Sequence, residues 1–132
     1  MANFTSEEAV RLKFRIEESD GATTALIEAN IAHAHQGIVS RIRPECIEAP
    51  PDAVIIAETL LAGAATLRSL GARLALDRRE TRLAGHQIET GRRFPALIET
   101  AAAAEAEAAR LIAPYERYTA ESEPVALLTE AH

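Results

Sequence analysis

The sequence predicts an all-α fold, a helical bundle of about four helices with a short hairpin or extended loop before the last helix and an extended C-terminal tail. Apolar residues recur at spacings of three and four over long stretches, which is the period of an amphipathic helix. Alanine is abundant and aromatic residues make up only 4% of the chain, which suits helices that approach one another closely. At 132 residues, the chain is long enough for one domain with a single core.

The first helix is expected from about Ser6 to Glu18. Thr5 or Ser6 can cap it, and two glutamates follow in the first turn, where the helix dipole favours negative charge. The apolar residues form two edges: Val10 and Phe14 on one, and Ala9, Leu12 and Ile16 on the other. Two interpretations stay open. One edge meets the core and the other a partner, or the stems of Lys13 and Glu17 cover one broad core face.

A second helix is predicted from about Thr23 or Thr24 to Arg43, after a break at Asp20-Gly21. Its apolar stripe consists of Ile27, Ile31, Ala34, Ile38 and Ile42. The following RPECIEAPPD is predicted to be a loop, because its paired prolines exclude helix immediately before them.

The third helix, from about residue 51 to residue 78, is expected to be enclosed by the others. Its stretch PPDAVIIAETLLAGAATLRSL carries one charge, Glu58, between Ala53 and Leu67. Residues 53–67 are too few for a bilayer, which needs roughly 20 apolar residues, so no membrane partner is expected. An enclosed Glu58 would need a partner, for which an arginine is the expectation, and a catalytic role is the alternative.

Between Glu80 and Thr90 the helical period is lost. Leu83 and Ile88 flank Ala84-Gly85-His86-Gln87, which indicates a short hairpin or extended loop with its turn at Gly85. The alternative is a connector without regular structure.

The last helix is expected to start between Arg92 and Pro95 and to end at Pro114. Arg92 and Arg93 are unfavourable at a positive helix start, so they lie outside the helix or face an acidic partner. Residues 1–115 form the helical domain, and residues 116–132 form an acidic tail with an apolar patch from Val125 to Leu128. That tail is either loose or a docking segment.

Charge and motifs exclude several functions. The net charge of -6 argues against a general nucleic-acid binder. The charge is uneven: -5 over residues 1–67 (five basic, ten acidic), +4 over 68–93 (seven basic, three acidic) and -5 over 94–132 (two basic, seven acidic), which suggests complementary surfaces. His33 and His35 point to opposite sides of a helix, so they cannot share an ion. We expect no cofactor, no metal, no catalytic residue and no internal disulfide from the lone Cys46.

Four segments occur in order over residues 6–115: SEEAVRLKF, NIAHAHQGIVSRI, PPDAVIIAETLLAGAATLRSLGA and GRRFPALIETAAAAEAEAARLIAPY. In this order and spacing the chain resembles the small helical head-to-tail connector (adaptor) proteins of tailed bacteriophages and prophages. The resemblance implies a non-enzymatic ring, commonly of twelve copies, between the portal protein and a tail or stopper protein in the virion neck, assembled in the bacterial host cytoplasm. DNA would pass through its lumen without specific binding. Residues 83–88 would match the family's projecting segment and residues 115–128 its C-terminal segment.

The candidate interface residues are Val10, Phe14, Leu83, His86, Ile88, Arg92, Arg93, Tyr115, Val125, Leu127 and Leu128. Two other functions stay open. One is a cytosolic regulatory or protein-interaction module, expected to be a dimer. The other is a helical-bundle metal enzyme built around Glu58 and a histidine.

Overall fold

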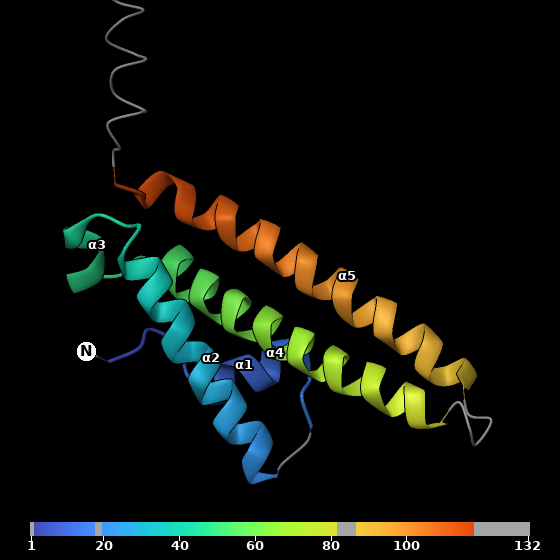
Figure 1. The fold of residues 1–132 in the computed structure, drawn as a ribbon. Coiled ribbons are helices and arrows are strands. Elements are labelled where there is room, and N and C mark those ends of the chain that lie inside the picture. Colours follow the sequence, from blue (N-terminus) through green and yellow to red (C-terminus); the bar gives the residue numbers. More distant parts are fainter. Residues whose placement is uncertain (1, 18–19, 82–86, 118–132) are drawn as a thin grey trace, which may run out of the picture.

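A computed structural model describes residues 2–17, 20–81 and 87–117 of the chain. The described residues form five α-helices and one 3-10 turn and contain no strand, which confirms the predicted all-helical class (Figure 1). The elements are α1 (Glu7–Phe14), α2 (Gly21–Val39), α3 (Pro44–Glu48), α4 (Asp52–Thr81), α5 (Gln87–Ile112) and η1 (Ala113–Tyr115).

Helix α1 is shorter than predicted. The Ser6 side chain accepts a hydrogen bond from the Ala9 N–H at 3.2 Å, as a capping residue does. The helix ends at Phe14 because Arg15 takes a left-handed conformation (φ 53°). The Ile16 N–H then bonds to the Arg11 carbonyl at 3.0 Å, which closes the turn.

Helix α2 begins earlier and ends earlier than predicted. Asp20 caps it by accepting from the Thr23 N–H at 3.2 Å, so the Asp-Gly pair starts the helix and does not merely interrupt the chain. The predicted stripe is confirmed, since all five of its residues are buried. The predicted loop after it is wrong at Pro44–Glu48, which form α3. Pro44 occupies the first turn of this helix, where its missing N–H costs no hydrogen bond.

Helix α4 is the central element and contacts α1, α2 and α5, as the sequence predicted. One cluster of buried residues joins α2, α3, α4 and α5, and a second joins the segment around α1 to α2 and α4. At Gly63 the ring of Phe14 on α1 lies very close to the backbone of α4. A Cβ built on this glycine would lie 1.9 Å from the Phe14 ring, so only glycine lets α1 pack here.

The apolar part of α4 is longer than the stretch considered in the sequence. By length and composition, Asp52–Leu74 could cross a bilayer, with a mean hydropathy of 1.5 over its most apolar window. The expectation that this segment is too short is therefore wrong. Half of that window is buried inside the protein, and the core helix of a folded domain has the same composition.

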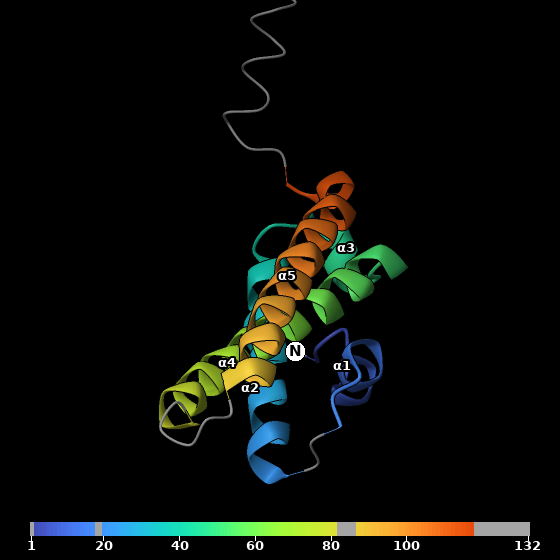
Figure 2. The ribbon, with the colours of Figure 1, turned by 90° about the vertical axis from the view of Figure 1, so that its right-hand side faces the viewer.

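Helices α4 and α5 run side by side and extend together beyond α1 and α2 (Figures 1 and 2). The expected extended segment is wrong at Glu80 and Thr81, which lie in α4, and at residues 87–90, which lie in α5. The predicted start of the last helix is also too late, and Pro95 lies inside α5. An interior proline removes one main-chain hydrogen bond and its ring opposes the carbonyl four residues earlier, so packing against α4 must offset this cost.

Candidate functional site

Glu58 is the only charged residue in the apolar stretch between Ala53 and Leu67, and its side chain is fully buried. Its Oε2 accepts hydrogen bonds from the main-chain N–H groups of Phe4 at 2.7 Å and Thr5 at 2.8 Å. Its Oε1 lies 2.7 Å from Nδ1 of His35. A carboxylate removed from water requires such donors. These bonds join the N-terminal segment, α2 and α4.

Further contacts complete this cluster, which we call the N-terminal clasp: Phe4, Thr5, His35, Glu58 and Thr59. The Phe4 ring meets the His35 ring edge-on, with 4.5 Å between centroids and 68° between planes. The hydroxyls of Thr5 and Thr59 lie 2.6 Å apart. Four separate contacts therefore hold residues 4 and 5 on the surface formed by α2 and α4.

The clasp contains a carboxylate and a histidine, and both side chains are buried. Glu58 is fully buried and His35 is 4% exposed, and neither lines either of the two cavities described below. General acid–base catalysis requires contact with the reacting group. Among residues 2–17, 20–81 and 87–117, no group of three or more His, Cys, Asp or Glu side chains could hold a metal ion. The geometry favours a structural role.

The expected arginine partner of Glu58 is wrong, because its hydrogen-bond partners are His35 and two main-chain amides. The amides come from residues more than 50 positions away in the chain, so no local pattern could reveal them. His35 lies buried beside the α2 stripe and is hydrogen-bonded to Glu58, whereas His33 is exposed. The two histidines therefore face different sides of α2, as their spacing predicted.

A second set of contacts fixes the end of the described chain. The Arg117 N–H donates to the Arg41 carbonyl at 2.7 Å, and the Arg43 N–H donates to the Tyr115 carbonyl at 3.0 Å. The Arg117 guanidinium also donates to the Ile42 carbonyl at 2.8 Å. We call residues 115–117 on residues 41–43 the C-terminal anchor. It fixes the last described residues beside the end of α2.

Between α1, α4 and α5 lies an open groove of about 360 Å³, which we call the α1–α5 groove. Its lining combines apolar and cationic residues: Lys13, Phe14, Arg15, Leu60, Thr100, Ala103 and Ala104. A second, more polar cavity of about 370 Å³ lies beside the N-terminal segment, lined by Asn3, Thr5, Ser6, Glu7, Glu28 and Ile31.

One ion pair links α4 to α5 at the surface. Arg68 donates from Nε to Glu105 Oε2 at 2.9 Å and from Nη2 to Oε1 at 2.6 Å. This paired contact holds the pKa of the Glu105 carboxyl below its usual value and raises the pKa of Arg68. On α1, the hydrogen bond from Arg11 likewise lowers the pKa of Glu7.

The candidate interface residues are not brought together in one place. Val10 is fully buried in the core, whereas Leu12 on the other edge of α1 is 83% exposed. Phe14 and Tyr115 are half-buried against the core.

Several other candidates lie in α5 or beyond the described part of the chain. Ile88, Arg92 and Arg93 belong to α5. Leu83, His86, Val125, Leu127 and Leu128 lie outside the described residues. The sequence-based candidates also omitted Lys13 and Arg15, whose placement beside the α1–α5 groove depends on where α1 ends.

Comparison with protein-family models, with curated proteins and with solved structures gives no match to this chain.

Proposed function

We propose that this protein is a structural assembly protein, a head-to-tail connector of tailed bacteriophages that forms a ring between the portal and the tail. It has no catalytic role in this proposal, and DNA passes through the ring without specific binding. The order of segments along residues 6–115 suggested this function, and the arrangement of the helices supports it physically.

The observation that carries the proposal is the overhang of the α4–α5 hairpin. Beyond α1 and α2, the two helices continue together with only each other as described neighbours (Figure 1). Leu76 lies in this region of α4 and is 61% exposed. A single exposed apolar residue is normal on a protein surface, so the projection itself supports the proposal and Leu76 is the position at which to test it.

Other apolar side chains are exposed on different parts of the subunit. Leu12 on α1 is 83% exposed, and Ile56 near the opposite end of α4 is 47% exposed. A ring built head to tail requires two different surfaces on each subunit, whereas a twofold dimer uses one surface twice. Exposed apolar residues at separate places fit the first arrangement.

The test uses the full chain, alone and co-expressed with a phage portal protein. Light scattering over a wide concentration range should show a mass that rises with concentration. Electron microscopy of the co-expressed pair should show closed rings on the portal. A mass of one chain at every concentration, with no portal complex, would rule the proposal out.

A pair of variants separates assembly from folding. Leu76→Glu should weaken association without lowering the melting temperature, because the side chain is largely exposed. Ala32→Glu places the same charge on an exposed position of α2 and should change neither. A stable dimer without portal affinity would favour the regulatory module. Stoichiometric metal that is lost in His35→Ala would favour the metal enzyme.

A further inference from the structure

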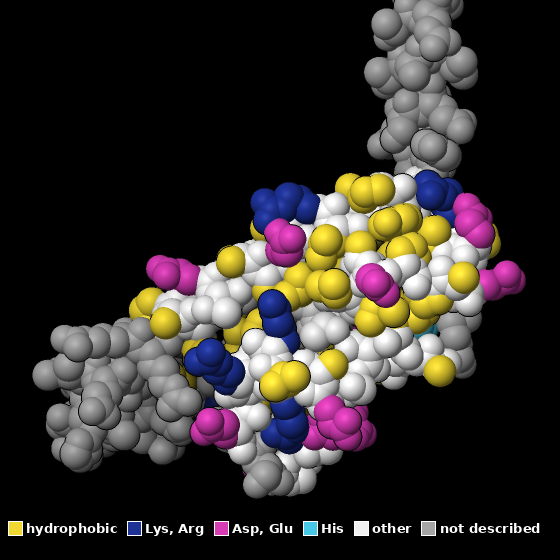
Figure 3. All heavy atoms as spheres, turned by 180° about the vertical axis from the view of Figure 1, so that it is seen from behind, with side chains coloured by type: hydrophobic (Ala, Val, Ile, Leu, Met, Phe, Trp, Pro, Cys, Tyr) yellow, Lys and Arg dark blue, Asp and Glu magenta, His cyan; other side chains and the backbone are white. Residues whose placement is uncertain are grey.

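The α1–α5 groove has a floor and a rim of different chemistry. Phe14, Leu60 and Ala104 supply apolar surface, whereas Lys13 and Arg15 place two positive charges beside it. No acidic residue lines the groove. Figure 3 shows this side of the molecule, where hydrophobic side chains form a band and side chains of both charges, Lys and Arg as well as Asp and Glu, lie on and beside it. The surface suits an extended segment with apolar residues and negative charge.

The two cations of the rim are available to a partner. Both are exposed, and neither Lys13 nor Arg15 forms an ion pair with another residue in the described part of the chain. Arg15 is fixed by its left-handed backbone conformation at the end of α1. A cation beside apolar surface strengthens the binding of an acidic segment and excludes a basic one.

The chain itself contains a segment with the complementary composition. Residues 118–132 carry Glu121, Glu123 and Glu130 and no lysine or arginine. Two of these acids precede the apolar patch from Val125 to Leu128. Negative charge followed by apolar residues matches a cationic rim beside an apolar floor.

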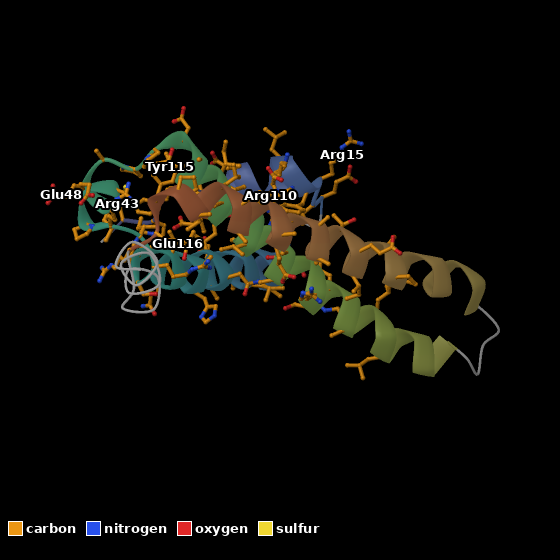
Figure 4. All side chains as sticks on the ribbon, turned by 90° about the horizontal axis from the view of Figure 1, so that it is seen from above. Arg15, Arg43, Glu48, Arg110, Tyr115 and Glu116 are labelled. Atoms are coloured by element: carbon orange, nitrogen blue, oxygen red, sulfur yellow. The ribbon has the colours of Figure 1, made fainter. Side chains whose placement is uncertain are left out.

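The last described residues lie on the side of the subunit away from its own groove. Figure 4 shows α1 with Arg15 on one side of α5 and α2 on the other, with Glu116 on the α2 side. The ion pair between Arg41 and Glu116 at 3.6 Å places Glu116 beside the end of α2. The eight residue steps from Arg117 to Val125 span at most about 28 Å when extended.

We propose that the α1–α5 groove binds residues 118–132 of a neighbouring copy of the protein. The apolar patch lies on Phe14 and Ala103, and the glutamates that precede it pair with Lys13 and Arg15. Donor and acceptor lie on opposite sides of one subunit, which is the arrangement that links copies head to tail. The inference deepens the proposed function and rests on it, since it assigns the contact between ring subunits.

Disulfide trapping in the full chain tests the contact. Both chains carry Cys46→Ala, which removes the native cysteine. One chain carries Ala103→Cys in the groove, and a second, mass-tagged chain carries Leu127→Cys. Oxidation should join the two chains. The matched control is Ala106→Cys, an exposed alanine on the same helix that does not line the groove.

The yield with Ala103→Cys should exceed the control about tenfold or more, because docking raises the local concentration of the thiol. Lys13→Glu and Arg15→Glu together reverse the charge of the groove rim and should reduce the yield of the disulfide-linked pair. Adding Glu121→Lys and Glu123→Lys to the partner chain should restore that yield. Equal yields from both alanine positions would overturn the inference. A second experiment combines Ala103→Cys and Leu127→Cys in one chain and dilutes that chain into cysteine-free protein. A disulfide bridge that forms only within one chain would also overturn the inference.

Failure of the inference and failure of the proposed function look different. Rings on the portal without the specific adduct would leave the connector function standing and remove this contact. Absence of any self-association, with or without the portal, would remove both.

Discussion

Removal of the Glu58 carboxylate should release the N-terminal segment and strongly destabilise the fold. Glu58→Ala deletes the acceptor of three hydrogen bonds, from the amides of Phe4 and Thr5 and from His35. A hydrogen bond to a charged group contributes about 1.5–3 kcal/mol, but three bonds to one carboxylate are not additive. Breaking a buried pair by removing one member costs about 3–5 kcal/mol, and we expect Glu58→Ala to fall in that range.

Glu58→Gln is the matched control for shape. Its amide oxygen can still accept from the two main-chain amides, while its NH₂ group faces His35. We therefore expect Glu58→Gln to lower the free energy of unfolding by about 1–2 kcal/mol, less than Glu58→Ala, because a neutral acceptor forms weaker bonds.

Urea unfolding of dilute protein measures both free energies, and hydrogen exchange measures the amides of residues 4 and 5. In Glu58→Ala these amides should lose protection before the rest of the domain unfolds, because their acceptor is gone. The reasoning is refuted if Glu58→Ala costs under about 1 kcal/mol, well below the range for a broken buried pair. It is also refuted if both amides keep their wild-type protection.

Three further perturbations test other parts of the structure. Gly63→Ala should lower the melting temperature, because the new Cβ meets the Phe14 ring and overpacking costs about 1–3 kcal/mol. Gly37→Ala is the matched control: a Cβ there enters open space on α2, so the free energy of unfolding should rise by about 0.5–1 kcal/mol. The stability difference between the wild type and Glu105→Gln should be largest at neutral pH. This difference should shrink as pH falls below about 4.3, the ordinary pKa of a glutamate in an unfolded chain. In the folded protein the pKa of Glu105 is lowered, so the charged carboxylate stabilises the domain above the unfolded-state pKa. That stabilisation is lost as Glu105 is protonated. Cys46 is 6% exposed, so a thiol reagent should react with it slowly in native protein and at once in denaturant; equal rates would contradict its burial.

The sequence by itself determined the fold class and the inner face of α2. Ile27, Ile31 and Ile38 are buried as their spacing predicted, because a helix places residues three and four apart on one side whatever surrounds it. Capping residues are equally local, so Ser6 correctly marks the start of α1. The enclosure of α4 also follows from composition, since a helix that is apolar nearly all round must be covered.

Tertiary structure decided the features that depend on residues far apart in the chain. Sequence identified Glu58 as unusual, but its donors come from residues 4, 5 and 35, which only folding brings together. The helices continue through Thr81 and restart at Gln87 because α4 and α5 stabilise each other, although the local period is lost there. The α1–α5 groove arises from three helices and from the left-handed turn at Arg15. Local patterns fix how each segment folds, whereas the contacts between segments fix which surfaces are left for a partner.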